Sequence, residues 1–383
     1  MKENNFETNA IRAQLDRSNN NEHSVPLYLT SSFVFDTADE MRAAFNDESD
    51  DFIYSRYSNP NTDEFVNKMC LLEGADAGIA TASGMAAIYT CLSALLKADD
   101  HIISCSSIFG ATHSLFTKYF PKRNISHTYF NANNPEEIEK IINKNTKLIY
   151  LETPTNPAIE IIDLELVSKI AKRNNLLFLV DNCFATPYLQ KPIKYGADIV
   201  IHSATKYIDG QGRVLGGVVL GKKDLIHEIY LFARITGPTL SAFNAWILSK
   251  SLETLAIRMD KHCENAHFIA YNLENHASLE FVKYPFLKSH PHYAIAIKQM
   301  KAGGGIVTFS LKGGAEAGKK MMDKLKMIKI SPNLGDTRTI ATHPASSTHC
   351  KLTEEERMAV GITPGLIRIS VGLENKEDIL KDI

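Results

Sequence analysis

A carboxylate, an amine and a glycine that precedes a helix stand where three apolar segments end, and together they could form a site that binds a ligand covalently. Asp181 closes the run LLFLVD, and Lys206 follows the apolar run DIVIHS within DIVIHSATK. A third run, AGIATAS, leads into Gly84, where we expect a helix to begin. The free backbone N–H groups and the dipole of a helix start attract anions. Because ligands of open α/β sheets sit outside the carboxyl ends of the strands, we expect these residues to share one site.

A lysine, a carboxylate and a phosphate-sized anion site together favour pyridoxal 5′-phosphate as a cofactor. Lys206 would form the Schiff base, Asp181 would keep the pyridine nitrogen protonated, and the helix start at Gly84 would hold the phosphate. Ser203 and Thr205 flank the lysine in SATK and would add hydroxyl donors. Each feature alone is weak, since SxxK also occurs in serine acylases and a lysine at a strand end is usually a solvated charge. Their order on successive strands predicts a pyridoxal phosphate enzyme and leaves its substrate open.

The elements that must position these residues alternate between helices and short apolar strands from about residue 61. This rhythm predicts βαβ crossovers and a mostly parallel sheet covered on both faces. Near residue 240 it gives way to helical periodicity that lasts for about 30 residues, followed by a smaller α+β unit. We therefore expect a polar N-terminal arm over residues 1–60, disordered or packed on a neighbouring subunit, a cofactor-binding α/β domain over 61–240, and a long linking helix with a C-terminal domain over 241–383.

The composition excludes several classes of protein. The chain has 383 residues, with 42 Lys and Arg against 44 Asp and Glu, and this near-neutral balance disfavours nucleic-acid binding. No apolar run approaches ~18 residues and no signal core opens the chain, so we expect a soluble cytoplasmic protein without a membrane partner. The six cysteines have neither CxxC nor zinc-ligand spacing. We therefore expect no metal site and no disulfide framework.

Eight motifs follow one another along the chain: YSRYSNPN (54–61), TASGMAA (81–87), ETPTNP (152–157), DNCFATP (181–187), SATKY (203–207), GQGRVLGG (210–217), HPASSTH (343–349) and RISVGLE (368–374). In sequence and order they resemble the pyridoxal phosphate enzymes of cysteine and methionine metabolism, which include cystathionine γ-synthase, cystathionine lyases, methionine γ-lyase and homoserine-ester sulfhydrylases. The resemblance implies the aspartate-aminotransferase-like fold (fold type I), an α/β fold whose mostly parallel sheet is flanked by helices and followed by a smaller α+β domain.

The resemblance also implies roles for individual residues. Lys206 matches the Schiff-base lysine, Asp181 the partner of the pyridinium nitrogen, and Asn156 the residue near the 3′-oxygen of the cofactor. Arg368 matches the guanidinium that grips the substrate α-carboxylate, a task that suits a bidentate arginine. The phosphate cup is matched by four residues, namely Gly84, Met85, Ser203 and Thr205.

Two further residues, Tyr54 and Arg56, match a pair that reaches the phosphate from the adjacent subunit. This match implies that the N-terminal region completes a neighbour's site. It also implies that the active unit is a dimer, which in this family is usually paired into a homotetramer.

Three residues depart from the family pattern. Phe109, in SSIFGATHS, stands where most members carry a tyrosine that stacks on the cofactor ring, so we expect it to bind the cofactor and to act in catalysis without a phenol. Ala111 stands where methionine γ-lyases carry cysteine. Asn333, in SPNLGD, replaces the usual serine and is expected to contact the substrate.

The missing phenol has a chemical consequence for the substrate. A thiolate, whose conjugate acid has a pKa of about 8.5, leaves more easily with help from a general acid, whereas a carboxylate, at about 4, leaves as an anion. Phe109 therefore favours an enzyme that releases succinate or acetate over one that releases methanethiol. The segments TGPTLSAFNAW and KYIDGQGRVLGG resemble the O-succinylhomoserine sulfhydrylases of the family, and this resemblance implies O-acylhomoserine and sulfide as substrates. Cystathionine γ-synthase and O-acetylhomoserine sulfhydrylase remain alternative activities, and methionine γ-lyase is less favoured. A further alternative is a binding protein that has the same fold and no catalytic activity. His343 and His349 are expected to order their loop.

Overall fold

The computed structural model describes residues 4–350 and 353–383. Its larger sheet has seven strands in the order β1-β7-β6-β5-β4-β2-β3, and within it only β7 runs antiparallel to its neighbours. The strands are β1 (Ala77–Thr81), β2 (His101–Cys105), β3 (Ser126–Phe130), β4 (Thr146–Glu152), β5 (Leu177–Asp181), β6 (Ile199–Ser203) and β7 (Gly217–Gly221). The mostly parallel sheet predicted from the alternating rhythm is confirmed.

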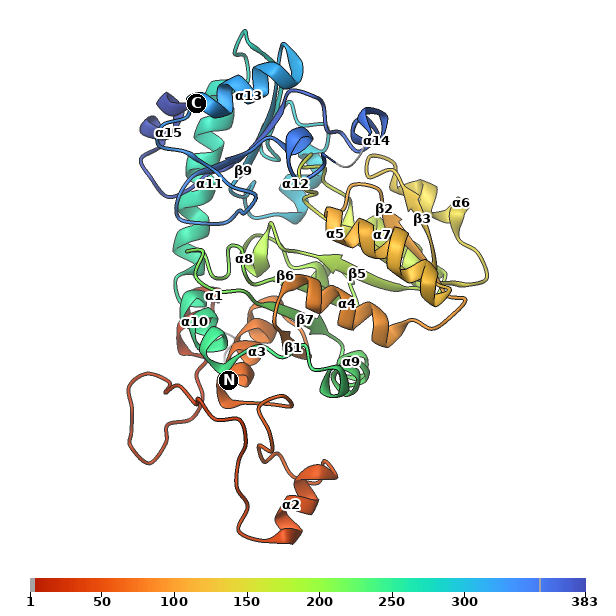
Figure 1. Cartoon of the computed structure of the whole chain (residues 1–383), viewed down its shortest axis with the longest axis vertical. Coiled ribbons are helices and arrows are strands. Elements are labelled where there is room, and N and C mark those ends of the chain that lie inside the picture. Colours follow the sequence, from red (N-terminus) through yellow and green to blue (C-terminus); the bar gives the residue numbers. More distant parts are fainter. Residues whose placement is uncertain (1–3, 351–352) are drawn as a thin grey trace.

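Helices cover this sheet through two buried hydrophobic clusters (Figure 1). The helices of the chain are α1 (Phe6–Arg12), α2 (Ala38–Phe45), α3 (Pro60–Glu73), α4 (Gly84–Leu95), α5 (Gly110–Ser114), α6 (Ile138–Ile141), α7 (Leu164–Arg173), α8 (Thr186–Leu189), α9 (Lys223–Thr236), α10 (Ala242–Leu252), α11 (Leu255–Leu273), α12 (Tyr293–Gln299), α13 (Gly314–Lys324), α14 (Glu354–Ala359) and α15 (Lys376–Asp382). Because central strands such as β5 are buried along almost their whole length, the polar residue at their end is the first to reach the edge of the core.

A second, smaller sheet lies toward the C-terminal end of the chain, as predicted, with the order β10-β11-β12-β9-β8. Its strands are β8 (Leu279–Lys283), β9 (Ile306–Leu311), β10 (Lys329–Ile330), β11 (Ile340–Thr342) and β12 (Leu366–Ser370). Figure 1 shows α11 running from the body of the large sheet up to this second sheet. The helix therefore links the two sheets in space.

The segment expected to form one long linking helix forms two helices, α10 and α11, that meet near Thr254. The cause is the buried side chain of Arg258, whose Nη2 donates to the carbonyl of Ser251 at 2.9 Å. Its Nη1 also donates to the carbonyl of Tyr207 at 2.6 Å. The guanidinium thus forms hydrogen bonds to a carbonyl near the end of α10 and to a carbonyl of the turn that follows Lys206, and so connects the helix junction to that turn.

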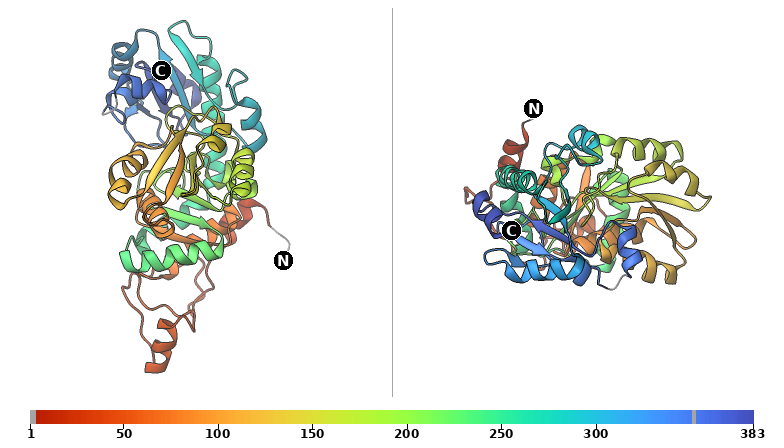
Figure 2. Two further views of the ribbon diagram at one scale, coloured as in Figure 1. Left: turned by 90° about the vertical axis from the view of Figure 1, so that its right-hand side faces the viewer. Right: turned by 90° about the horizontal axis from the view of Figure 1, so that it is seen from above.

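The N-terminal region divides into two parts, which refines the expectation of a single arm over residues 1–60. Helix α1 packs on the chain's own body, because Phe6 and Ala10 share one face and the ring of Phe6 contacts that of Tyr188 at a centroid distance of 5.0 Å. The following residues leave the body, and α2 lies at the far end of this projection (Figures 1 and 2). Side chains such as Leu29 and Val34, 72% and 96% exposed, lack cover from their own chain.

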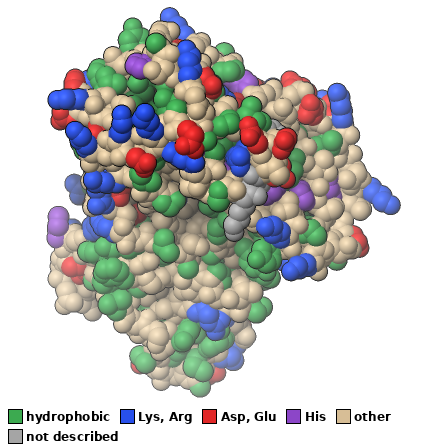
Figure 3. Space-filling view, turned by 45° about the horizontal axis from the view of Figure 1, so that its top comes forward, with side chains coloured by type: hydrophobic (Ala, Val, Ile, Leu, Met, Phe, Trp, Pro, Cys, Tyr) green, Lys and Arg blue, Asp and Glu red, His purple; other side chains and the backbone are tan. Residues whose placement is uncertain are grey.

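The face of the molecule in Figure 3 shows no large patch of only acidic or only basic side chains. Acidic and basic side chains lie interspersed on the upper part of that face, and hydrophobic side chains gather on its lower part. Within residues 4–350 and 353–383, no helix is both long and apolar enough to cross a bilayer.

A buried ion pair fixes α3, which leads out of the N-terminal projection, against α10. Lys68 is fully buried, and its Nζ lies 3.1 Å from Oε1 of Glu64 and 3.6 Å from Oε1 of Glu253. Two charges taken out of water are stable only while each has its partner. The pair therefore makes the packing of these two helices sensitive to the loss of either group.

We expect Lys68→Met to lower the free energy of unfolding by about 3–5 kcal/mol, because the carboxylate of Glu64 would stay buried without a cation. Urea denaturation followed by the fluorescence of Trp246, the single tryptophan, measures this change. The matched control is Lys319→Met, which removes an exposed ion pair with Glu316 and should cost less than about 1 kcal/mol. Equal effects of the two substitutions would contradict the interpretation.

Candidate active site

A cavity of about 460 Å³ opens at the carboxyl ends of the parallel strands, beside loops of the smaller sheet. Most of the residues singled out in the sequence line it, namely Gly84, Met85, Phe109, Asn156, Asp181, Ser203, Thr205, Lys206, Asn333 and Arg368. The structure brings these residues together. The strand-end argument predicted this for Asp181, Lys206 and Gly84 with the hydroxyls of Ser203 and Thr205, and the family resemblance implied the others. Tyr54 and Arg56 are not among the lining residues.

The start of α4 forms one wall of the cavity. Ser83 caps the helix, and its Oγ accepts the backbone N–H of Ala86 at 3.1 Å. A Cβ on Gly84 would lie 2.6 Å from the Cβ of Ser203, so only glycine allows the helix start to approach the end of β6 this closely. The backbone N–H groups of the first turn and the nearby hydroxyls of Ser203 and Thr205 suit a phosphate group.

Asp181 is buried at the end of β5. Its Oδ1 accepts the backbone N–H of Cys183 at 3.0 Å, and the hydroxyl of Tyr150 donates to Oδ2 at 3.5 Å. Burial raises the pKa of Asp181 from its ordinary value to about 6, although both hydrogen bonds act in the opposite direction. A carboxylate in this setting gains from a cationic N–H donor in the cavity.

Lys206 lies just beyond the end of β6, and its Nζ donates to Oδ1 of Asn333 at 2.7 Å. Burial lowers the pKa of Lys206, and the nearby positive charge of Arg368 lowers it further. A lysine with a lowered pKa has more of the neutral amine that attacks carbonyl carbon and removes protons. The amide of Asn333, which we expect to contact the substrate, also bonds to the lysine and lines the cavity.

Arg368 is buried on β12 and faces the cavity from the smaller sheet. Its Nη1 donates to Oδ1 of Asn156 at 3.0 Å, and its Nη2 donates to the carbonyl of Asn333 at 2.9 Å. Within the described chain its buried Nε has no hydrogen-bond partner. Burial lowers the pKa of Arg368 to about 10, so the guanidinium is still charged at neutral pH. A charged, incompletely bonded guanidinium suits a carboxylate ligand.

Phe109 lies at the mouth of the cavity and is 40% exposed. Its ring offers a flat apolar surface on which a planar cofactor can stack. Its backbone N–H donates to Oε2 of Glu152 at 3.0 Å. The ring carries no hydroxyl, and Ala111, two residues later, adds none.

Sequence reasoning missed Glu152, which lines the same cavity, and Tyr150, which bonds to Asp181. A signal for Glu152 was present, because the run KLIYLE ends in a carboxylate just as LLFLVD does. In the sheet, β4 and β5 pair with Glu152 directly beside Asp181. In the sequence, Tyr150 looks the same as an aromatic residue of the hydrophobic core, because it lies within the apolar run KLIYLE.

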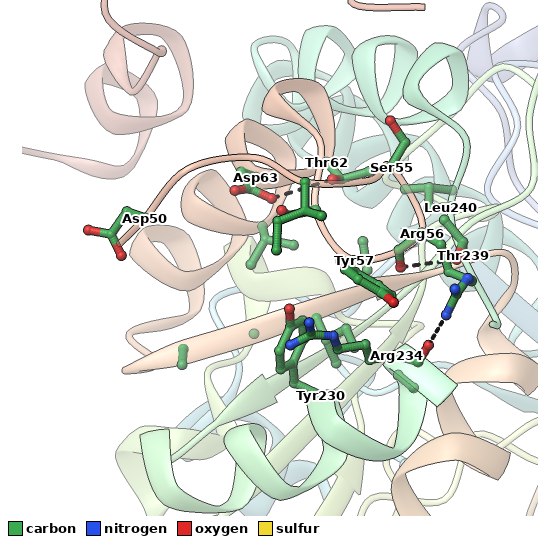
Figure 4. Close-up of a pocket in the computed structure, with 18 of the residues that line it drawn as sticks. Asp50, Ser55, Arg56, Tyr57, Thr62, Asp63, Tyr230, Arg234, Thr239 and Leu240 are labelled. Atoms are coloured by element: carbon green, nitrogen blue, oxygen red, sulfur yellow. Dashed lines mark hydrogen bonds between the residues drawn. The ribbon is translucent and has the colours of Figure 1, made fainter. Parts of the chain in front are cut away.

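Tyr54 and Arg56 lie apart from this cavity. Arg56 lines a second cavity of about 600 Å³ between the N-terminal projection, β1 and α9 (Figure 4). There its guanidinium donates to the carbonyl of Arg234, whose own guanidinium lies 4.1 Å from the centroid of the Tyr57 ring. Although this cavity is the larger, its lining residues in the described chain include no lysine. It therefore lacks the groups on which the strand-end chemistry depends.

The first cavity fits pyridoxal 5′-phosphate on three counts. Gly84 permits the close contact that forms an anion cradle, Asp181 is a buried carboxyl group aimed at the cavity, and Lys206 has a lowered pKa. These features would hold the phosphate, the ring nitrogen and the aldehyde carbon, respectively.

Comparison with known proteins agrees with this fit. The family model described as Cys/Met metabolism PLP-dependent enzyme matches residues 7–383. The chain belongs to this family. It is therefore a pyridoxal phosphate-dependent enzyme, and the recognition made from the eight motifs is confirmed.

Relatives within the family carry different activities in their names. An L-methionine γ-lyase of Fusobacterium nucleatum is 44% identical over 100% of this chain and 98% of its own. An O-succinylhomoserine sulfhydrylase of Pseudomonas aeruginosa is also 44% identical, over 99% of this chain and 94% of its own. Another of that name, from Mycobacterium tuberculosis, is 41% identical over 98% and 94%. Overall identity therefore does not separate a lyase from a sulfhydrylase.

Solved structures confirm the fold. A putative O-acetylhomoserine (thiol)-lyase of Campylobacter jejuni, with N′-pyridoxyl-lysine-5′-monophosphate, matches with a TM-score of 0.95 and 33% identity over 99% of this chain and 98% of that one. The cystathionine γ-synthase of Xanthomonas oryzae pv. oryzae matches with a TM-score of 0.93 and 35% identity over 99% and 96%. The predicted fold of the family is thus the fold of this chain.

We expect Asp181→Asn to stabilise the cofactor-free protein at neutral pH. Because the pKa of Asp181 is raised from 3.8 to about 6, the folded protein binds this proton more tightly than the unfolded chain does. The resulting cost to folding is complete above about pH 6, declines as the pH falls, and is absent below about pH 4. Urea denaturation should show the variant more stable than wild type by roughly 1–3 kcal/mol at pH 7.5 and equal to it near pH 4.

The opposite order at pH 7.5, with the Asp181→Asn apoprotein less stable than wild type, would show that the carboxylate is satisfied without a ligand. Titration with pyridoxal 5′-phosphate on the same samples provides the functional counterpart, since the more stable variant should bind the cofactor less tightly.

Proposed function

We propose that this chain is an O-succinylhomoserine sulfhydrylase, which replaces the succinyloxy group at Cγ of O-succinylhomoserine with sulfide to give homocysteine. The observation that carries this proposal is Phe109, whose ring lines the cavity without a hydroxyl, and the described lining residues of this chain include no tyrosine that could act as a general acid in its place. A carboxylate leaves without such help, whereas a thiolate benefits from it. The wall of the cavity thus suits an ester better than a thioether such as methionine.

The charges of the cavity favour sulfide over cysteine as the nucleophile. Among its lining residues in the described chain, the cations are Lys206 and Arg368. Arg368 is suited to the α-carboxylate of the first substrate, and Lys206 to proton transfer. Cysteine would bring a second carboxylate, as the succinyl group of the ester already does, and the described lining residues of this chain offer no further cation for either, while hydrosulfide requires none. This argument weighs against cystathionine γ-synthase activity.

Methionine γ-lyase is the second candidate, because relatives with that name are as similar as the sulfhydrylases. Phe109 and Ala111 weigh against it. The two activities differ in the group that leaves Cγ, so the reaction products distinguish them.

The proposed reaction assigns one task to each buried group. Bound pyridoxal 5′-phosphate supplies an electron-accepting ring that stabilises negative charge at the substrate Cα. Arg368 holds the α-carboxylate, Asp181 keeps the proton on the ring nitrogen, and the amine of Lys206 removes the proton from Cα and later returns it. Lys206 also takes a proton from Cβ, and the electron pair left there expels succinate from Cγ with the electrons of the C–O bond. Hydrosulfide then forms the C–S bond at Cγ, and Cβ and Cα regain their protons. Ester and hydrosulfide thus give homocysteine and succinate.

We further propose that two subunits share each site and that dimers pair into a homotetramer. Tyr54 and Arg56 lie outside their own chain's cofactor cavity, and Arg56 lines the second cavity beside the N-terminal projection. Exposed apolar side chains on this projection, including Leu29 and Val34, are suited to burial on a neighbour. A phosphate contact from Arg56 in the neighbouring site would give the projection its role.

The substrate test combines O-succinylhomoserine or O-acetylhomoserine with sulfide or cysteine and identifies the products, with methionine alone as a further arm. We expect homocysteine from O-succinylhomoserine and sulfide to form at least about tenfold faster than any other product, a difference of about 1.4 kcal/mol in barrier. Phe109→Tyr restores a phenol and should raise the release of methanethiol from methionine by about 100-fold or more, the usual effect of a general acid.

If the wild-type enzyme released methanethiol from methionine faster than it formed homocysteine, the proposed activity would be wrong and the chain would be a methionine γ-lyase. Faster formation of cystathionine would identify a synthase. A Phe109→Tyr variant with unchanged methionine turnover would remove the observation on which the proposal rests.

Shared sites predict that two inactive variants complement each other. Lys206→Ala and Arg56→Ala should each lose most activity as pure proteins. After they are unfolded together and refolded as a 1:1 mixture, one site of every mixed dimer regains both residues, so about a quarter of the wild-type activity should return. The control refolds each variant alone. A mixture with no more activity than its components would contradict sharing of the site between subunits.

A further inference from the structure

Among the described residues that line the cofactor cavity, two are acidic, Asp181 and Glu152. The proposed reaction gives a task to Asp181 and none to Glu152. It ends β4, is only 4% exposed, and lies beside Asp181 in the register of the two strands. Two buried carboxyl groups this close to one another disfavour ionisation of both, and this lowers the stability of the folded protein at neutral pH. The contacts of Glu152 indicate what it does in the site.

We propose that Glu152 is a positioning residue whose carboxyl group holds two walls of the cofactor cavity in place. On one side, its Oε2 accepts the backbone N–H of Phe109 at 3.0 Å. On the other side, Glu152 and Asn156 line the same cavity, and the backbone N–H of Asn156 lies close enough to the carboxyl group to lower its pKa. The first contact fixes the loop that carries the stacking ring, and the second fixes the loop that follows β4.

The second contact extends from the cofactor to the substrate. The side-chain Oδ1 of Asn156 accepts Nη1 of Arg368 at 3.0 Å. Arg368 is the group suited to the substrate α-carboxylate. A displacement of Glu152 would therefore move the ring wall directly and the carboxylate anchor through Asn156, so that one side chain supports both binding steps.

The surroundings of Glu152 favour a neutral, protonated side chain. Burial and the adjacent carboxyl group of Asp181 raise the pKa of Glu152 well above its ordinary value, and this outweighs the lowering by the two N–H donors and by Arg368. Asp181 is the better site for the negative charge, because it also receives the N–H of Cys183 and the hydroxyl of Tyr150. Glu152 thus accepts hydrogen bonds without placing a second charge next to Asp181.

A neutral acceptor has a close chemical substitute in glutamine. Glu152→Gln keeps the size and a carbonyl oxygen for the N–H of Phe109, whereas Glu152→Ala removes that acceptor and leaves the N–H of Phe109 without it. Glu160 provides the matched control. It lies on the same segment and is equally buried, but its Oε1 pairs with Nζ of Lys283 at 2.5 Å and it does not line the cavity.

The experiment measures cofactor binding in place of turnover, so it does not depend on which substrate the enzyme uses. Apoproteins of wild type, Glu152→Ala, Glu152→Gln and Glu160→Gln are titrated with pyridoxal 5′-phosphate. The dissociation constant, the visible circular dichroism of the bound cofactor and the melting temperature are recorded for each. KM for the preferred amino-acid substrate is measured on the loaded enzymes.

We expect Glu152→Ala to weaken cofactor binding about tenfold, to reduce the visible dichroism and to raise KM, because the N–H of Phe109 loses its acceptor. Glu152→Gln should remain within about threefold of wild type on each measure. Glu160→Gln should lower the melting temperature and leave the cofactor dissociation constant and dichroism unchanged. Glu152→Leu, which fills the space without an acceptor, replaces the alanine variant if that protein does not fold, and should resemble it.

Unchanged cofactor affinity and dichroism in Glu152→Ala or Glu152→Leu would overturn the positioning role. A glutamine variant as impaired as the alanine variant would overturn the neutral state of Glu152. A loss of cofactor affinity in Glu160→Gln equal to that in Glu152→Ala would show a general effect of destabilising the segment, and would overturn the proposal as well. A substrate preference other than O-succinylhomoserine would change none of these outcomes.

Discussion

The site depends on charged groups that apolar strands and helices hold out of water. Burial shifts the pKa of Asp181, Lys206 and Arg368 toward the neutral form of each. An isolated buried charge is unfavourable, and these groups face a common cavity without forming ion pairs with one another. Pyridoxal 5′-phosphate, with its ring nitrogen and aldehyde, and an amino acid, with its carboxylate, would together supply a partner for each of the three. The same burial that destabilises the protein without its ligands thus makes the site selective for them.

The two sheets supply complementary parts of this arrangement. The large sheet delivers Asp181 and Lys206 at neighbouring strand ends, and the glycine at the start of α4 lets that helix start approach Ser203 at the end of β6. The smaller sheet supplies Arg368, which also fixes the loop that bears Asn333. Because Asn333 in turn bonds to Lys206, Lys206 and Arg368 are connected across the junction of the sheets.

Sequence reasoning found the residues whose position follows from a simple rule. Asp181, Lys206 and Gly84 end or follow apolar runs, and the geometry of a parallel sheet then places them together. What it could not find depends on three-dimensional contacts between distant segments. The hold of Asn333 on Lys206 joins residues 127 positions apart, and the break between α10 and α11 depends on Arg258 reaching the carbonyls of another loop.

The central claim is that Asp181 carries the negative charge of the carboxyl pair and keeps a proton on the ring nitrogen of the cofactor. Nitrogen-15 NMR of the enzyme loaded with ring-labelled pyridoxal 5′-phosphate measures that proton directly. The account predicts a protonated ring nitrogen at neutral pH in wild type and an unprotonated one in Asp181→Asn. An unprotonated nitrogen in the wild-type enzyme would contradict it.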